Sequence, residues 1–167
     1  MTEHMPSQPH DLTGAFKGAM RRLATTVTIA TTRGLDGQPI GMTATAVTSL
    51  SLDPPALLIC VNRSASMHRV LTMGHRFCVN LLNCDHGELS RAFGGGLAPD
   101  RRFGLGSWEH GDGEVPYLAD AQSNVFCVVD GLHDYGTHTI VIGRVESVRL
   151  HGDVRPLIFG DGRFLPV

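Results

Sequence analysis

Residues 41–66 read GMTATAVTSLSLDPPALLICVNRSAS, and the rest of the chain is interpreted outward from this segment. It begins with small residues, from Gly41 to Ala46, which leave room for a flat ligand to lie close to the backbone. Pro54 and Pro55 break the chain and predict a turn. The run that follows, Ala56–Val61, is entirely apolar, and its length predicts a buried strand.

Polar residues follow that strand, and they include an amide, a guanidinium and two hydroxyls at Asn62, Arg63, Ser64 and Ser66. They stand where a helix is expected to begin, and the free N–H groups of a helix start favour an anion. An arginine would add charge-assisted hydrogen bonds. The pattern predicts a slot for a planar polar ring with an anionic tail held at one end. The alternative is that residues 43–51 are only a small-residue strand and turn, followed by a polar helix cap.

Length and composition narrow the class of protein. A chain of 167 residues is expected to form one domain, here residues 11–167, preceded by a disordered tail over residues 1–10. The net charge is −2 and the basic residues are scattered, which argues against a nucleic-acid or membrane surface as partner. Residues 1–20 lack the apolar core of a secretion signal, and the longest apolar runs are too short for a bilayer. We therefore expect a cytoplasmic protein.

The cysteines and histidines do not predict a metal site. None of the four cysteines is separated from another by the CxxC spacing, and three of them, Cys60, Cys78 and Cys127, lie in apolar runs that predict buried, reduced thiols. Cys84 and His86 are two potential ligands, too few for a site. The chain also lacks GxGxxG after a strand, GxxxxGK[ST], HExxH and GxSxG.

The hydrophobic patterns predict a mainly β fold. Helices are expected at Asp11–Leu23, at Ser66–Met73, and after a capping box formed by Asp85 and Glu88; residues 97–108 are expected to be a loop. Most strands are joined by hairpin-length links, which favours an antiparallel barrel with peripheral helices over a doubly wound parallel sheet. The expected strands are Val27–Thr32, Ile40–Val47, Ala56–Val61, Arg76–Leu82, Val115–Ala119, Ala121–Asp130, Thr137–Leu150 and a last one around Arg163–Leu165.

Four pieces, taken in order, resemble a known family. They are the Gly-Met-Thr-Ala loop at 41–44, the Ser-x-Ser-x-Asp-Pro-Pro turn at 49–55, the Val61-Asn62 strand end, and Gly136-Thr137-His138. This order is similar to that of the flavin reductases that supply reduced flavin to two-component monooxygenases, including reductases for 4-hydroxyphenylacetate hydroxylation and pyrimidine degradation. The resemblance runs from about Phe16 to the C-terminus.

The resemblance implies a split antiparallel β-barrel of the Greek-key, FMN-binding kind, which forms a homodimer with flavin sites at the subunit contact. It implies hydride transfer from NADH or NADPH to FMN, with FAD also acceptable, and delivery of the reduced flavin to a separate monooxygenase. Two other readings remain open: a flavin- or haem-binding split barrel without turnover, and an enzyme like pyridoxamine-phosphate oxidase. The second should carry more basic residues than this chain has.

The resemblance also implies roles for particular residues. Threonine hydroxyls and loop amides would meet the flavin ring, residues 62–66 would hold the ribityl phosphate, and His138 would orient the nicotinamide. Thr137 stands where the family commonly has aspartate, which puts that partner of His138 in question. Arg163 and Phe164 either close the site or form a final strand, and Trp108 is a candidate for stacking. The residues implied in cofactor binding are Thr43, Ala44, Thr45, Ala46, Ser49, Leu50, Ser51, Val61, Asn62, Arg63, Ser64, Ser66, Asn80 and His138. Asn80 could instead be a buried residue whose amide is satisfied.

Overall fold

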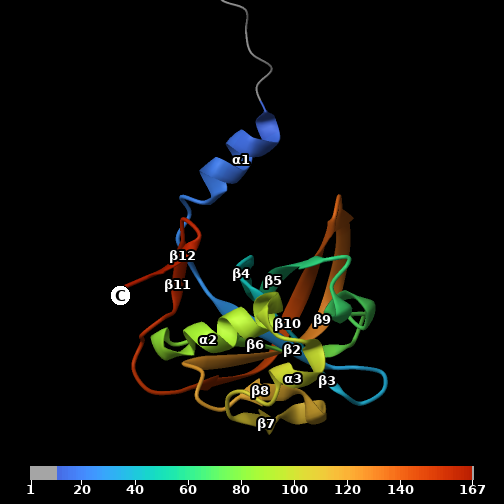
Figure 1. The fold of residues 1–167 in the computed structure, drawn as a ribbon. Helices are drawn as coiled ribbons and strands as arrows, with labels where there is room; N and C mark the ends of the chain where they lie inside the picture. Colours follow the sequence, from blue (N-terminus) through green and yellow to red (C-terminus); the bar gives the residue numbers. More distant parts are fainter. Residues whose placement is uncertain (1–10, 167) are drawn as a thin grey trace, which may run out of the picture.

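A computed structural model describes residues 11–166, and its centre is a seven-stranded antiparallel sheet (Figure 1). The strand order is β3-β2-β6-β9-β10-β5-β4. These strands are β2 (Thr28–Arg33), β3 (Pro39–Ala44), β4 (Val47–Leu52), β5 (Pro55–Asn62), β6 (Arg76–Leu81), β9 (Ser123–Tyr135) and β10 (His138–Leu150). The predicted tail over residues 1–10 lies outside the described residues.

Two smaller sheets and several short helices surround this sheet. One sheet joins β1 (Thr25–Thr26), β11 (Ile158–Gly160) and β12 (Arg163–Leu165), and the other joins β7 (Trp108–His110) and β8 (Pro116–Leu118). The α-helices are α1 (Leu12–Met20), α2 (Gly87–Arg91) and α3 (Pro99–Arg102). Short 3₁₀ turns are η1 (Ser66–Arg69), η2 (Cys84–His86) and η4 (Asp112–Glu114), and a π-helical turn, η3 (Ala92–Gly96), continues α2.

The large sheet is forced to curl by its own connectivity. β3 and β4 occupy its two opposite edges, yet only Thr45 and Ala46 join them along the chain. The three Cα–Cα steps from Ala44 to Val47 span at most about 11 Å, so both edges must come together at this point. The sheet therefore wraps into a barrel that remains split between β3 and β4. This confirms the predicted fold class: mainly β, antiparallel and split, with peripheral helices.

Alternation along the strands builds the barrel core. In β5, Leu57, Ile59 and Val61 are buried while the residues between them are partly exposed, which is the period of two expected of a strand. Their side chains pack with Phe77, Val79 and Val141 from β6 and β10. A second cluster forms beneath α2, around Phe93 and Leu118.

Two residues with a possible ligand role belong to this second cluster instead. A Cβ on Gly41 would lie 2.5 Å from Phe93 Cε1, so the glycine makes room for Phe93 rather than for a ligand. Trp108 packs its ring 5.2 Å from that of Phe93 and 4.8 Å from that of Phe103. Its indole N–H donates to the carbonyl of Leu105. Both residues therefore contribute to packing around Phe93. This corrects the expectation that the Trp108 ring stacks on a ligand.

Several predicted elements have different limits. The strand expected at Ile40–Val47 ends at Ala44, and the expected turn over residues 48–51 is strand β4. The helix expected at Ser66–Met73 is only η1, and the loop expected at residues 97–108 contains α3. Asn83, not Asp85, caps the turn before α2, because its side chain accepts from Asp85 N while His86 Nδ1 accepts from Asn83 N.

The cysteines are all free, and only two of the three expected to be buried are so. Cys78 and Cys127 are buried, and burial raises the pKa of the Cys127 thiol to about 12. Cys60 is partly exposed because it lies on the outer face of β5, opposite Ile59 and Val61. None of the helices in residues 11–166 has the length and apolar character needed to cross a membrane.

Candidate functional site

The split in the barrel places unpaired backbone donors at the surface. Thr45 and Ala46, which bridge the two sheet edges, are both exposed. The neighbouring carbonyls are bonded within the protein: Ala44 O accepts from Thr28 Oγ1 at 2.7 Å, and Ala46 O accepts from Cys60 N at 3.0 Å. Within residues 11–166, the amides of Thr45 and Ala46 have no acceptor. Residues 43–46, called the split segment below, therefore offer hydrogen-bond donors to a ligand.

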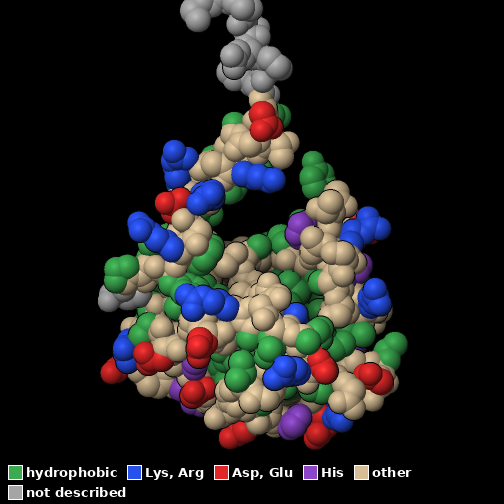
Figure 2. Space-filling view, in the orientation of Figure 1, with side chains coloured by type: hydrophobic (Ala, Val, Ile, Leu, Met, Phe, Trp, Pro, Cys, Tyr) green, Lys and Arg blue, Asp and Glu red, His purple; other side chains and the backbone are tan. Residues whose placement is uncertain are grey.

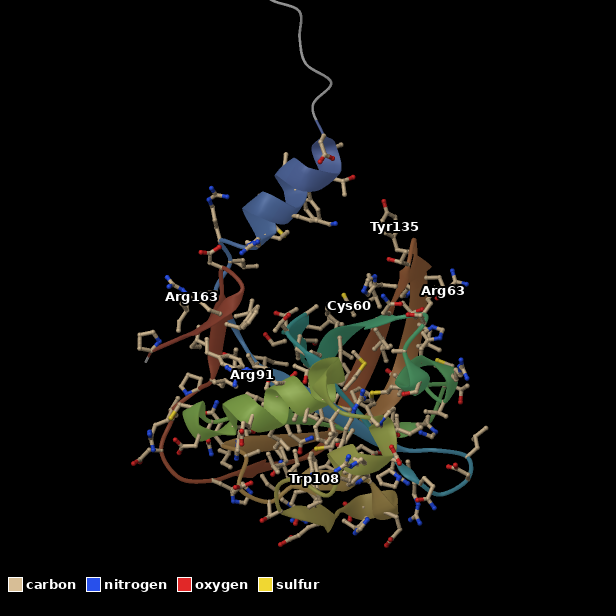
Figure 3. The ribbon with its side chains drawn as sticks, viewed as in Figure 1. Cys60, Arg63, Arg91, Trp108, Tyr135 and Arg163 are labelled. Carbon is tan, nitrogen blue, oxygen red and sulfur yellow. The ribbon has the colours of Figure 1, made fainter. Side chains whose placement is uncertain are left out.

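The split segment borders a hollow on the surface. Figure 2 shows this hollow between the β11–β12 side of the molecule and the projecting ends of β9 and β10. We call it the central groove; Arg91 and Arg163 lie on one side of it, and Cys60 and Arg63 lie on the other (Figure 3). Thr45 lines three neighbouring cavities of about 550, 700 and 310 Å³, so it stands where they meet. The groove is large enough for a polycyclic ligand.

The rest of the segment 43–51 divides between the groove and the core. Thr43 lines the 310 Å³ cavity, and its hydroxyl donates to Ser90 O at 2.6 Å. Ser49 and Ser51 line the 550 Å³ cavity, whereas Leu50 between them does not. Ala44 is 7% exposed and lines none of the groove cavities. Val61 is fully buried in the barrel core, backbone included, and pairs with Thr139 of β10, which corrects its assignment to cofactor binding.

The predicted phosphate segment is a tight turn at the end of β5. Asn62 Oδ1 accepts from both Ser64 N, at 2.9 Å, and Ser64 Oγ, at 2.8 Å. Arg63 N donates to Thr137 O, which ties the turn to the β9–β10 connection. In the described residues no carboxylate lies within ion-pair distance of the Arg63 guanidinium, so its charge is available to a ligand.

One part of the phosphate prediction is wrong. The helix expected to bind the anion at its start is only the four-residue 3₁₀ turn η1, whose first turn has no side-chain cap. Ser66, its first residue, lines a different cavity together with Gly41 and Arg102. The anion-binding capacity of this region therefore depends on Arg63 and not on a helix terminus, because both donors of Ser64 are bonded to Asn62 Oδ1.

His138 lies beside this turn. It is the first residue of β10 and pairs in register with Asn62 of β5. Its Nδ1 is 2.9 Å from Thr137 Oγ1, so the threonine supplies the hydrogen bond that was in question without an aspartate. The imidazole is exposed and leaves Nε2 free to meet a ligand. His138 is thus brought beside Asn62 and the turn that carries Arg63.

Sequence reasoning missed a polar network behind His138. His68 Nε2 is 2.8 Å from Thr139 Oγ1, and the same hydroxyl donates to Asp134. This hydrogen bond is the main cause that lowers the pKa of Asp134, and the positive charge of Arg63 adds to it. These residues come from three separate elements, and no local motif in the sequence marks them.

Asn80 is not part of the groove. It is fully buried, and its side chain donates to Ile29 O at 2.8 Å and to Thr31 Oγ1 at 3.1 Å. Its Oδ1 accepts from Leu118 N and Asn124 Nδ2. Every polar atom of the side chain therefore has a partner within the protein. The structure supports the alternative of a buried, satisfied amide and corrects the assignment of Asn80 to cofactor binding.

The last strand contributes one face of the groove. Phe164 of β12 lines the 310 Å³ cavity with Thr43 and Thr45, and its ring lies 4.9 Å below the guanidinium carbon of Arg91. Arg163 is exposed beside it. The predicted final strand is therefore present, and Phe164 also faces the groove. Sequence reasoning did not single out Arg91.

The donor set fits a flavin nucleotide better than a metal ion. Residues 11–166 contain no group of three histidine, cysteine or acidic residues close enough to hold a metal. By contrast, the unpaired amides of Thr45 and Ala46 match the heteroatoms of an isoalloxazine ring, and Arg63 matches a phosphate at the end of its ribityl chain. The exposed imidazole of His138, opposite Asn62, is available to orient a second nucleotide.

Comparison with known proteins identifies relatives over nearly the whole chain. The family model described as "Flavin reductase like domain" matches residues 20–167. The reductase component of the FADH(2)-dependent resorcinol hydroxylase of Rhizobium sp. (strain MTP-10005) is 39% identical over 150 residues, covering 89% of this chain and 84% of the relative. The "FMN reductase (NADH) RutF" of Agrobacterium fabrum (strain C58 / ATCC 33970) is 38% identical over 149 residues, covering 89% of this chain and 85% of that protein.

Solved structures agree with these sequence relatives. The NADH:FAD oxidoreductase SgcE6 of Streptomyces globisporus C-1027, in complex with NAD and FAD fragments, superposes with a TM-score of 0.85 at 30% identity, covering 99% of this chain and 97% of that one. BorF, the flavin reductase component of a bacterial two-component tryptophan halogenase, gives a TM-score of 0.82 at 30% identity, covering 92% of this chain and 96% of that one.

Proposed function

This chain belongs to the family of flavin reductase like domains, and from that premise we propose that it is the reductase component of a two-component oxygenase system. It oxidises a nicotinamide nucleotide, reduces a flavin and supplies the reduced flavin to a separate oxygenase. FMN is the proposed flavin and NADH the proposed reductant, with FAD as the second candidate flavin. The relatives named "FMN reductase (NADH)" support this choice.

The single observation that carries the proposal is the pair of unpaired amides at Thr45 and Ala46, which line the groove, on a chain that also presents the Arg63 guanidinium without an ion-pair partner in residues 11–166. A bound flavin supplies an N5 atom that accepts a hydride from C4 of the nicotinamide. The chain positions the two nucleotides: the split segment binds the ring, Arg63 binds the phosphate, and His138 orients the nicotinamide. Reaction by stacking and proximity requires no acid or base from the protein.

The decisive test is steady-state oxidation of each nicotinamide, followed by absorbance, with FMN, FAD or no added flavin. We expect a flavin-dependent rate that is highest with NADH and FMN and is absent without flavin. A tightly held chromophore without nicotinamide oxidation would instead support the non-catalytic binding protein. Oxidation of pyridoxamine 5′-phosphate without a nicotinamide would support the oxidase alternative. Either result would reject the proposal.

We further propose that the active form is a homodimer. Helix α1 has no buried residue, and Leu12, Phe16 and Met20 on it are 78%, 60% and 48% exposed. It stands away from the rest of the molecule (Figure 1). An isolated helix of this length is marginal in water, and exposed apolar clusters commonly mark interaction surfaces. Leu52 of β4, near the groove, is 89% exposed as well. A second copy of the chain would cover both surfaces.

The dimer can be tested by mass. Light scattering coupled to gel filtration should give twice the chain mass for the wild type, and the Phe16→Asp/Leu52→Asp variant should shift towards the monomer. Leu35→Asp is the matched control, because Leu35 is 90% exposed but lies in the β2–β3 turn. A monomeric wild type at micromolar concentration would reject the homodimer without affecting the reductase proposal.

His138 is proposed to position the nicotinamide. In His138→Ala, we expect the KM for NADH to rise about 3- to 10-fold, because the variant loses one neutral hydrogen bond to the nicotinamide. The Kd for FMN should stay within about 2-fold of the wild-type value. Thr137→Val should cause a smaller rise, because it removes only the bond to Nδ1 that orients the ring. Steady-state kinetics and a flavin fluorescence titration measure the two constants. An unchanged KM in both variants would remove His138 from the site.

We also place the reaction in the cytoplasm. The four cysteines form no disulfide in the structure, which suits a reducing compartment where nicotinamide nucleotides are available. The proposed partner is a flavin-dependent oxygenase that accepts the reduced flavin after it dissociates.

A further inference from the structure

Arg91 carries a positive charge to which the proposed function assigns no role. It is the last residue of α2, it is exposed, and its guanidinium lies over the ring of Phe164, 4.9 Å from the centroid. In residues 11–166 it has no carboxylate within ion-pair distance, whereas Arg21 and Arg76 each have one. Contact with an aromatic face restrains the guanidinium without neutralising it. The guanidinium of Arg91 is therefore fixed in position by Phe164 and remains available to an anionic ligand.

This charge faces a cavity that includes the split segment. The cavity has a volume of about 310 Å³ and is lined by Arg91, Phe164, Ser90, Thr43 and Thr45, among others. Its polar groups are hydroxyls and one cation, and no acidic side chain lines it. It is thus suited to a group that is rich in hydrogen-bond acceptors and carries partial or full negative charge.

The position of this cavity relative to Arg63 selects the part of the ligand that reaches it. Figure 3 places Arg63 and Arg91 on opposite sides of the central groove, with Cys60 nearer to Arg63. The carbonyl of Ala46 accepts a hydrogen bond from Cys60 N. Along strand β5, Cys60 lies two residues, or about 7 Å, before Asn62, which precedes Arg63. On the proposed function, a flavin ring that lies along the amides of Thr45 and Ala46 has one edge beside Thr45, and Thr45 lines the same cavity as Arg91.

The two candidate far edges differ in chemistry. The dimethylbenzene edge is apolar, whereas the pyrimidine edge carries two carbonyls and N1. Hydride transfer forms an N5–H bond on the flavin and breaks the C4–H bond of the nicotinamide, so one electron pair and one proton move together. The nicotinamide becomes cationic, and the flavin gains one negative charge that is spread over N1 and the C2 carbonyl. A positive charge at the pyrimidine edge therefore stabilises the reduced flavin more than one at the dimethylbenzene edge.

We propose that Arg91 contacts the N1 and C2-carbonyl edge of the flavin and stabilises the negative charge that hydride transfer creates there. The inference rests on the proposed reductase function and adds a catalytic residue to it. Phe164 is the positioning residue that holds the guanidinium. Because the pyrimidine edge is common to riboflavin, FMN and FAD, the effect of Arg91 is expected to be the same for all three.

The test compares oxidised with reduced flavin. In Arg91→Gln, we expect the Kd of oxidised FMN to change by less than about 3-fold and that of anaerobically reduced FMN to rise about 10-fold relative to it, as for one charge-assisted hydrogen bond. By linkage, the midpoint potential of bound FMN should fall by about 30 mV for a two-electron couple. Riboflavin should show the same ratio. Arg91→Lys should restore most of the potential, and Phe164→Leu should show an intermediate shift.

Arg101→Gln is the matched control, because Arg101 is also an exposed arginine near the end of a short helix but does not line the cavity. It should behave as the wild type. A loss confined to FAD would place Arg91 at the adenylate half, a change only in the KM for NADH would place it at the nicotinamide nucleotide, and equal losses for both redox states would make it a simple binding group. Each of these results overturns the inference. A wild type without flavin-dependent activity would instead reject the proposed function itself.

Discussion

Replacing Asn80 with alanine is expected to lower the free energy of unfolding by about 3–4 kcal/mol, one of the largest effects of any single substitution in this chain. The side chain joins β6 to β2 through Ile29 O and Thr31 Oγ1, and to the β8 region through Leu118 N. All of these groups are buried, so water cannot replace the lost amide. Each unpaired buried group costs about 1–3 kcal/mol.

Thermal unfolding followed by circular dichroism measures this effect, and for a chain of this size the midpoint should fall by about 10 °C. Asn80→Asp should also destabilise the fold, because it removes both N–H donors and buries a carboxylate. The Kd for FMN of whatever fraction remains folded should be unchanged in either variant. A variant with normal stability and weakened FMN binding would show that Asn80 belongs to the flavin site after all.

Replacing Arg63 with glutamine is expected to raise the Kd for FMN about 10- to 100-fold. The guanidinium is exposed, lacks a carboxylate partner in residues 11–166, and is held at one end of the groove by the bond from Arg63 N to Thr137 O. A charge-assisted bond to a phosphate contributes about 1.5–3 kcal/mol, which corresponds to this range. Fluorescence titration of the flavin gives the constant directly.

Riboflavin makes this experiment specific, because it has the same ring and no phosphate. Its affinity should change by less than about 2-fold in Arg63→Gln, and Arg101→Gln should leave both affinities as in the wild type. High salt should weaken FMN binding to the wild type more than to the variant, since screening acts on the charge that the variant lacks. Equal weakening of riboflavin and FMN would contradict a phosphate contact.

The elements with a clear period were predicted well. The apolar run at Ala56–Val61 lies within β5, and the long patterns at residues 121–130 and 137–150 overlap most of β9 and β10. Short elements were harder, because local signals compete there. The hydroxyl-rich residues 48–51 read as a turn, but pairing with β5 makes them strand β4. The capping residue before α2 was misplaced by two positions, since Asn83 and Asp85 are both good caps.

The candidate site was also predicted in part. Thr45, Ala46, Arg63 and His138 were singled out from the sequence; the structure places Thr45 and Ala46 on the groove and His138 beside Asn62, next to Arg63. Arg91 was missed because its significance depends on Phe164, which reaches it from the far end of the chain. Ser66 was included because it is close to Arg63 in the sequence, but the 3₁₀ turn directs it to another cavity.

The sequence alone determined that the chain is mainly antiparallel β and that small and hydroxyl-bearing residues gather between Thr43 and Ser66 with one arginine, Arg63, because side-chain period and local composition are properties of neighbouring residues. Only the tertiary structure decided that the two sheet edges meet at Thr45 and Ala46 and leave their amides unpaired. It also decided that Asn80 is sealed in the core and that Arg91 faces the groove. These outcomes depend on which strands pair across the barrel, and strand order is set by packing between distant segments.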